Sequence, residues 1–238
     1  MLIFAHRGAS ALEPENTLPA LNAACTADTV AVEFDIHQVD GKLMVIHDRY
    51  LERTTSGSGL LIAHNFVQLR QLDAGNGAVI PTLDEALAVV AQQCIINIEL
   101  KGIAIEDLSL LFQYLDDAKA VLKLDFNKIL LSSFNHHLLQ VIYRHRPEFN
   151  LGALTACLPL EHAKFAEQLA AYSVHIVVDY VSAEFVSDAH QRGLKVYVYI
   201  VDKLPDIKKM KALGVDGIFA NNPAQARQYL QQITSHSA

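Results

Sequence analysis

Hydrophobic residues follow two alternating patterns along most of the chain. Short, mainly apolar runs, such as 95–100 and 196–201, are separated by longer stretches in which apolar residues recur every three or four positions, such as 183–192. The short runs are apolar on both faces, which is typical of buried parallel strands, and the longer stretches predict amphipathic helices. The chain is therefore predicted to alternate strands with helices.

The alternation amounts to about eight strand-then-helix repeats with one extra hairpin strand after the second. We predict strands at 2–5, 29–37, 43–46, 95–100, 129–133, 151–154, 175–179, 195–201 and 216–220, and helices at 17–27, 82–92, 105–122, 136–146, 160–171, 183–192, 205–213 and 223–234. Eight repeats in 238 residues predict an α/β fold of the (β/α)8 TIM barrel type. An open doubly wound sheet is the alternative, but Gly8-Ala9-Ser10 does not supply the glycine-rich turn expected after its first strand.

One segment interrupts the alternation. Between Asp48 and Pro81 the apolar pattern loosens, and glycine-rich clusters surround one short helical piece near 67–72. The segment is too short and too poor in apolar residues to fold alone. We therefore predict a single barrel domain, 1–238, in which residues 48–81 form a small insertion over the barrel mouth.

Composition and charge narrow the classes of partner. Hydrophobic residues make up 51% of the chain, and the net charge of -7 provides no field that would attract nucleic acid or anionic lipid. No stretch approaches the ~20 apolar residues of a membrane span, and residues 1–5 lack a signal-peptide pattern, so we expect no stable membrane insertion. Cys25, Cys94 and Cys157 are scattered and odd in number, which favours a reduced, cytoplasmic protein.

Two acidic residues share one face of the second predicted strand. Glu33 and Asp35 are two positions apart in the apolar run 30–36, so alternation places both carboxylates together. A surface strand with both acids in water is the simpler interpretation. Glu99 repeats the pattern in a second strand, followed two positions later by Lys101, and this favours a buried site. Clustered carboxylates are costly to bury unless a hard divalent cation lies between them, and Mg²⁺ or Ca²⁺ suits such ligands equally well.

Several polar and aromatic residues fall at predicted strand ends. They are His6, Glu33, Asp35, Glu99, Ser133 and Phe134. The carboxyl ends of the strands form the face on which barrels carry their active sites, so we expect these residues to meet at one mouth. His37 shares the face of Glu33 and Asp35 but is expected past the strand end, and it stays an open candidate.

Short motifs spread from residue 6 to residue 217 form a specific combination, although each alone is weak. They are His6-Arg7-Gly8, Pro14-Glu15-Asn16-Thr17, Glu33-x-Asp35, Asp40-Gly41, His47-Asp48, Leu51-x-Arg53-Thr54, Ile80-Pro81-Thr82-Leu83, Asn97-x-Glu99-x-Lys101, Ser132-Ser133-Phe134 and Gly214-Val215-Asp216-Gly217. With these motifs in this order, the chain resembles the glycerophosphodiester phosphodiesterase family.

The resemblance implies a metal-dependent phosphodiesterase that hydrolyses glycerophosphodiesters to an alcohol and sn-glycerol 3-phosphate. It assigns metal ligands (Glu33, Asp35 and Glu99), catalytic residues (His6 and His47) and substrate-binding residues (Arg7, Lys101, Phe134 and Tyr199). The chemistry is consistent with these residue types, because a cation offsets the charge of the diester and a general acid assists its poor alkoxide leaving group. Histidines suit acid and base roles near neutral pH. We favour His47 as the acid, and the attacking group, water or the substrate's glycerol hydroxyl, stays open.

Two stretches depart from the family pattern. Tyr199-Ile200-Val201-Asp202 stands where a Trp-Thr-Val-Asn-like run is usual, and Asn221-Asn222-Pro223 stands where Asp-x-Pro is common. The smaller ring and the hydroxyl of Tyr199 bear on which alcohol fits. The missing acid at 221 bears on substrate preference rather than on catalysis, because the metal-binding and proton-transfer residues are present.

Two other functions stay open. A related phospholipase-like barrel acting on intact lipids or lysolipids would need an exposed apolar rim or an amphipathic helix at the mouth. Leu60-Leu61-Ile62 and Phe66 lie in the insertion without a basic amphipathic face, which favours a water-soluble substrate. A non-catalytic phosphate-binding protein is the other alternative, and the complete set of histidines and carboxylates argues against it. The sequence leaves open whether the chain forms a homo-oligomer.

Overall fold

Parallel strands closed into a ring form the centre of the molecule. The structure is a computed structural model that describes residues 1–26 and 31–235. Within these residues the ring strands are β1 (Leu2–Ala5), β2 (Ala31–Val39), β4 (Ile95–Gly102), β5 (Ile129–Ser133), β6 (Asn150–Thr155), β7 (Ser173–Val177), β8 (Lys195–Tyr199) and β9 (Gly217–Ala220). They follow the order β1, β9, β8, β7, β6, β5, β4, β2, and pairing of β1 with β2 closes the ring. The predicted (β/α)8 barrel is confirmed.

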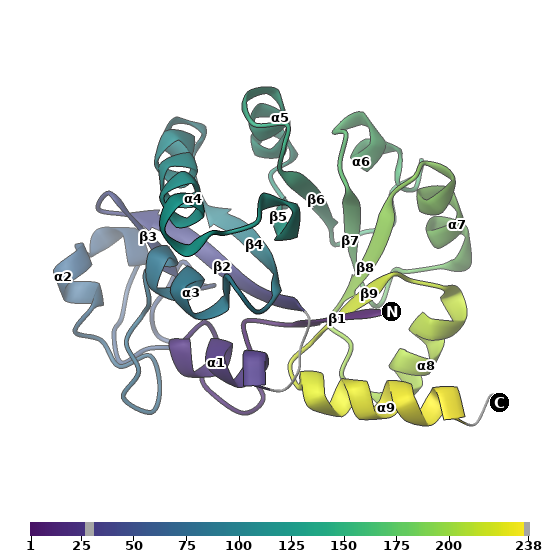
Figure 1. Ribbon diagram of the computed structural model, residues 1–238, viewed down its shortest axis with the longest axis horizontal. Coiled ribbons are helices and arrows are strands. Elements are labelled where there is room, and N and C mark those ends of the chain that lie inside the picture. Colours follow the sequence, from purple (N-terminus) through teal and green to yellow (C-terminus); the bar gives the residue numbers. More distant parts are fainter. Residues whose placement is uncertain (27–30, 236–238) are drawn as a thin grey trace.

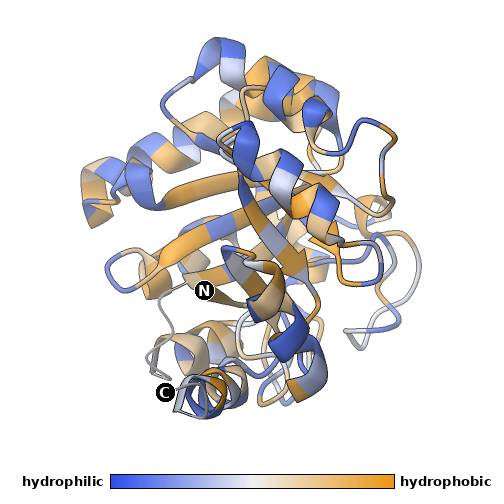
Figure 2. Cartoon of the chain, turned by 90° about the vertical axis from the view of Figure 1, so that its right-hand side faces the viewer, coloured by the Kyte–Doolittle hydropathy of each residue, from blue (hydrophilic) through white to orange (hydrophobic). Residues whose placement is uncertain are grey.

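Helices between the strands surround the ring (Figure 1). They are α1 (Leu18–Thr26), α3 (Leu83–Val90), α4 (Leu108–Leu122), α5 (His136–His145), α6 (Lys164–Gln168), α7 (Ala183–Gln191), α8 (Leu204–Leu213) and α9 (Pro223–Ser235). In α3 the buried residues Leu83, Leu87 and Val90 recur at helical spacing, so this face packs on the sheet. Figure 2 shows the same division in colour, with largely hydrophobic strands and hydrophilic positions along the outer helices.

The insertion departs from the strand-and-helix rhythm as predicted. β3 (Lys42–Val45) pairs antiparallel with β2 through a turn at Asp40 and Gly41, which both adopt left-handed backbone angles. The following segment holds a 3-10 turn, η1 (Leu61–Ala63), and the short α2 (Phe66–Leu69), seen at the left of Figure 1. Its buried apolar side chains form a small cluster of their own with residues of the hairpin.

Several predicted boundaries are wrong, and those of α6 and β7 show why. The helix expected at 160–171 is shortened to α6, because His162 and Ala170 adopt left-handed backbone angles, which an α-helix does not accommodate. The strand expected at 175–179 begins earlier, at Ser173, because the ladder pairs Ser173 with both Gly152 and Lys195. The predicted helix end at 27 and strand start at 29 lie outside the described residues. None of the described helices is long and apolar enough to cross a membrane.

Candidate active site

Alternation along the strands brings polar side chains to one end of the barrel interior. Phe4, Tyr197 and Phe219 pack together inside the ring. Side chains two positions further along a strand point to the same side. Counting in steps of two from the residues of this inner cluster gives the inward-facing positions nearer the carboxyl ends of the strands. They are His6, Glu33, Asp35, His37, Asn97, Glu99, Lys101, Ser132, Tyr199 and Asn221. The barrel interior is thus apolar at one end and polar at the other, as the strand-end pattern predicts.

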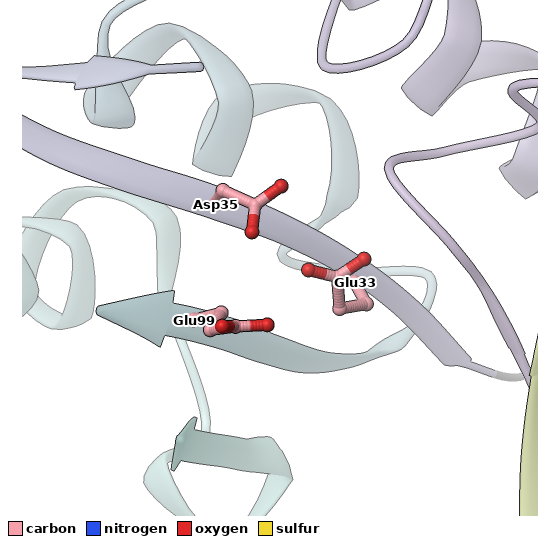
Figure 3. A group of neighbouring side chains, drawn as sticks. All are labelled: Glu33, Asp35 and Glu99. Carbon is pink, nitrogen blue, oxygen red and sulfur yellow. The ribbon is translucent and has the colours of Figure 1, made fainter. Parts of the chain in front are cut away.

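Three carboxylates meet between two neighbouring strands. Glu33 and Asp35 come from β2 and Glu99 from β4, and one oxygen of each lies within 4.8 Å of the others. Figure 3 shows the three side chains turned into a common space. Their exposed fractions are only 2%, 1% and 9%. Sequence alternation predicted this cluster, and register completes it because Asp35 pairs directly with Glu99.

Burial and mutual repulsion favour the protonated forms of two of these acids. Burial, together with the charges of Asp35 and Glu99, raises the pKa of Glu33 well above its usual range. Burial and the charge of Asp35 raise the pKa of Glu99 to about 7. The buried Oε1 of Glu33 has no hydrogen-bond partner. An orphaned carboxylate oxygen facing two further carboxylates fits a hard divalent cation, which takes oxygen ligands.

Two cationic side chains border the acidic cluster. Lys101 Nζ lies 2.6 Å from Glu99 Oε1 and 3.7 Å from Asp35 Oδ1. Arg7 Nε lies 3.4 Å from Asp35 Oδ2, and the Arg7 backbone N–H donates to Glu33 Oε2 at 2.8 Å. Arg7 reaches the cluster because its φ of 55° interrupts the extended backbone after β1. Gly8 then allows the chain to pass α1, since a Cβ there would lie 2.6 Å from the Ala20 carbonyl carbon.

The two candidate catalytic histidines have different partners. His6 Nδ1 lies 2.8 Å from the amide oxygen of Asn221. His47 Nδ1 lies 2.5 Å from a carboxylate oxygen of Asp48. Burial, reinforced by the charge of Arg7, lowers the pKa of His6 to about 4, so this imidazole is neutral near pH 7. An amide therefore supports one histidine and a carboxylate supports the other.

A chain of charged contacts links His47 to Arg7 across the insertion. Arg53 donates to Asp48 at 2.5 Å and makes two hydrogen bonds, of 2.8 and 2.7 Å, to the carboxylate of Glu15. Glu15 in turn accepts a hydrogen bond of 2.7 Å from Arg7. Although burial opposes it, the hydrogen bonds from Arg53 and the charge of Arg7 lower the pKa of Glu15 to about 2. These contacts fix the side chains at the two ends of the chain, those of His47 and Arg7.

His37 lies inside β2, not past the strand end as expected, and its ring supports the backbone at His47. Its Nε2 lies 3.0 Å from the His47 backbone oxygen. The ring packs so closely on Gly102 that a Cβ there would lie 2.1 Å from His37 Nδ1. His37 therefore holds the backbone on which His47 stands. Ser133, also expected at the mouth, donates its hydroxyl to the Leu100 carbonyl at 2.9 Å and so ties two strands together.

Two aromatic side chains form one wall of the site. The rings of Phe134 and Tyr199 meet edge to face with centroids 6.3 Å apart, and Lys101 Nζ lies 5.4 Å from the centre of the Phe134 ring. The Tyr199 hydroxyl donates to the Thr155 carbonyl at 2.9 Å, which fixes the ring. Phe134 is 45% exposed and is therefore available to a ligand.

The structure connects to the site several residues that sequence reasoning left unassigned or, for Asp48, left open between orienting His47 and beginning the loop. They are Glu15, Asn16, Asp48, Arg53, Asp202 and Asn221. Asn16, for example, donates to Asp35 Oδ2 at 2.9 Å and accepts from the Asp35 backbone N–H at 3.2 Å. All six lie in motifs or departures noted in the sequence, but only the fold shows which side chains they contact.

Comparison with known proteins agrees with this architecture. The model of the glycerophosphoryl diester phosphodiesterase family matches residues 6–225. The chain is similar to glycerophosphodiester phosphodiesterases from Caldanaerobacter subterraneus subsp. tengcongensis, at 32% identity over 93% of this chain and 94% of that protein, and from Bacillus altitudinis, at 33% identity over 94% and 96%. It is also similar to the structure of an Oleispira antarctica phosphodiesterase in complex with the product sn-glycerol-3-phosphate, with a TM-score of 0.85, 30% identity and coverage of 97% of each chain.

The fold and the site define a barrel hydrolase of the phosphodiesterase class. Because the match extends over nearly the whole chain, the protein belongs to the glycerophosphoryl diester phosphodiesterase family. Its enzymatic class is that of the glycerophosphodiester phosphodiesterases.

Proposed function

We propose that the enzyme hydrolyses glycerophosphodiesters to an alcohol and sn-glycerol 3-phosphate with the help of a divalent metal ion and two histidines. The observation that carries the proposal is the buried cluster of Glu33, Asp35 and Glu99, bordered by two cations at the barrel mouth. The product bound by the similar Oleispira antarctica phosphodiesterase supports the choice of product.

Glu33, Asp35 and Glu99 would hold the metal ion, Mg²⁺ or Ca²⁺. When bound, such an ion neutralises charge on the phosphate and on the oxygens that attack and leave. A bound cation would stabilise the ionised forms of all three carboxylates, whose combined charge exceeds that of Arg7 and Lys101. The chain's own residues therefore fit a metal-dependent site.

Arg7 and Lys101 would bind the phosphate. Both lie against the carboxylate cluster, and both can turn a donor toward an oxyanion there. Phe134 and Tyr199 would pack on the apolar parts of the substrate, because they form the wall beside Lys101. This wall is where the preference for one alcohol over another would be decided.

His6 and His47 would move the protons. His6 is neutral near pH 7 and can accept the proton of the attacking group. His47, whose Nδ1 lies 2.5 Å from a carboxylate oxygen of Asp48, would donate a proton to the leaving alkoxide. The different partners of the two rings support this division of labour.

Residues 48–81 would cover the barrel mouth and control access of the headgroup. Arg53 of this segment contacts Glu15 beside the site, and Arg70 anchors the segment to α3 through two hydrogen bonds of 2.7 and 2.8 Å to Glu85. A cytoplasmic location remains a prediction from the cysteine pattern.

Product analysis tests the proposed function. The enzyme in Mg²⁺ or Ca²⁺ is given glycerophosphocholine, glycerophosphoethanolamine and a lysolipid, and the products are identified by ³¹P NMR. The proposal predicts sn-glycerol 3-phosphate from the first two substrates. Release of glycerol with the phosphate left on the headgroup alcohol would contradict the proposal. Turnover of the lysolipid alone would contradict it as well.

A further inference from the structure

The end of β9 supports His6 from one side of its ring. β1 and β9 pair in register at Ala5 and Ala220, so the next residues, His6 and Asn221, face each other beyond the strand ends. His6 Nδ1 lies 2.8 Å from Asn221 Oδ1. The same amide oxygen accepts a hydrogen bond of 3.0 Å from the Ser10 hydroxyl. Asn221 is thus the group that sets the position of this imidazole.

Asp202, just after β8, decides which way round the Asn221 amide lies. The Asn221 backbone N–H donates to Asp202 Oδ1 at 2.8 Å, and the side-chain Nδ2 donates to Asp202 Oδ2 at 2.7 Å. A carboxylate only accepts hydrogen bonds, so the NH₂ group must face Asp202. The carbonyl oxygen of the amide must then face His6.

The orientation of the Asn221 amide also determines which nitrogen of the His6 ring carries the proton. An amide oxygen has no hydrogen to give, so the hydrogen bond to His6 requires a proton on Nδ1. A neutral imidazole carries one proton, and Nε2 is then left as the acceptor. The order of carboxylate, amide and imidazole therefore selects one of the two neutral tautomers.

We propose that Asn221 and Asp202 are positioning residues that hold His6 in the Nδ1–H tautomer, with Nε2 as the proton acceptor for the attacking group. The inference rests on the proposed function, since it specifies how His6 serves as the base. Both residues stand where the sequence departs from the family pattern. Relative to that pattern the acid and the amide are exchanged, and the neutral amide of Asn221 stands next to His6.

The charges around His6 are consistent with a neutral ring. Burial and Arg7 lower the pKa of His6, and they outweigh Asn221, Asp35 and Glu15, which act in the opposite direction. An amide orients the imidazole without adding the negative charge that would favour the imidazolium. His47, in contrast, has a carboxylate, that of Asp48, beside its Nδ1.

Nitrogen NMR of histidine-labelled enzyme in Mg²⁺ reads the tautomer directly. We expect wild-type His6 to show a protonated Nδ1 and an unprotonated Nε2. In Asn221→Ala the acceptor is lost, so His6 should become a mixture of tautomers, and kcat on glycerophosphocholine should fall roughly 10- to 100-fold with little change in KM, as part of the general-base contribution is lost.

A charge-conserving exchange tests the order of the two groups. In the double variant Asp202→Asn/Asn221→Asp the acid faces His6, so the Nδ1–H tautomer should persist while the acid limb of the kcat/KM profile moves to higher pH. Asn222→Asp is the matched control, because it adds one charge in the same loop and keeps the hydrogen bond from Gln225 N–H that caps α9. Its tautomer should be that of the wild type.

A wild-type His6 with its proton on Nε2 would overturn the inference. An unchanged tautomer and unchanged kcat in Asn221→Ala would overturn it as well, since Asn221 would then only support the loop. If the wild type shows the Nδ1–H form but does not cleave glycerophosphocholine, the positioning holds and the proposed function fails.

Discussion

Glu99 is buried beside a second acid and a lysine, and this environment predicts how the metal-free protein responds to pH. Its pKa in the folded protein is raised from 4.5 to about 7. The folded state therefore holds this proton more tightly than the unfolded state. The resulting stabilisation is complete below about pH 4.5 and is lost as the pH rises through about 7. Glu33 acts in the same direction.

Thermal unfolding after chelation measures this effect. Between pH 5.5 and pH 8 the wild type should lose a few degrees of Tm relative to Glu99→Gln, whose side chain stays neutral. The exposed Glu106 provides the control, and Glu106→Gln should follow the wild type across this range. A Tm difference between wild type and Glu99→Gln that does not change with pH would contradict the raised pKa.

The division of labour between the histidines predicts a selective rescue. His6→Ala and His47→Ala should each lose about 10²- to 10⁴-fold in turnover of glycerophosphocholine. A substrate with a p-nitrophenolate leaving group needs little protonation, so it should restore much of the activity of His47→Ala and none of that of His6→Ala. Rescue of both variants, or of neither, would show that the roles are assigned wrongly.

For individual residues, the alternation of side chains along the strands predicted most of the site but not the contacts that support it. Glu33, Asp35 and Glu99 follow from a period of two and from the pairing of neighbouring strands. The contact between Asn221 and Asp202 could not be predicted, because it depends on how two loops from separate strands turn toward each other. The left-handed backbone of Arg7, which brings its side chain to the carboxylates, has no signature in the pattern of apolar residues.

At the scale of elements, the insertion contributes the side chain of Arg53, and its replacement should lower the activity. Arg53 uses its planar guanidinium to join Asp48 and Glu15. Arg53→Lys keeps the charge but cannot make this forked contact. We expect kcat/KM on glycerophosphocholine to fall roughly 10- to 100-fold, in the range seen for groups that orient a reactive side chain.

The Tm of Arg53→Lys should change little, because Arg53 is about half exposed and such ion pairs contribute little stability. Arg49→Lys is the matched control in the same segment, since the Arg49 guanidinium lies over the Tyr50 ring. Equal loss of activity in the two variants would mean that the segment responds to any change and that Arg53 has no particular role.

Element prediction succeeded where the apolar pattern was long and failed where local backbone geometry decided the outcome. The helices covering the barrel were found because their buried faces repeat at helical spacing, as in α3. The length of α6 was wrong, since left-handed residues at 162 and 170 limit it. The start of β7 was wrong because pairing with both neighbours, rather than local apolarity, fixes where a strand begins.

For the whole molecule, counting repeats was enough to predict the barrel, because eight strand-and-helix units close through the pairing of β1 with β2. Closure brings residues from both ends of the chain together, and His6 therefore meets Asn221. The sequence also predicted that residues 48–81 lie over the mouth, and this stays a prediction. The contacts of Arg53 with Glu15 and of Arg70 with Glu85 are consistent with it.

The central claim is that three carboxylates at the barrel mouth bind a divalent ion on which phosphodiester cleavage depends. The most direct measurement is turnover of glycerophosphocholine by enzyme treated with excess EDTA and then supplied with Mg²⁺ or Ca²⁺, alongside calorimetric binding of each ion to wild type, Glu33→Gln, Asp35→Asn and Glu99→Gln. We predict no turnover in EDTA, recovery with at least one ion, and weaker binding of that ion in all three variants. Full turnover in excess EDTA, or unchanged ion binding in the three variants, would contradict the account.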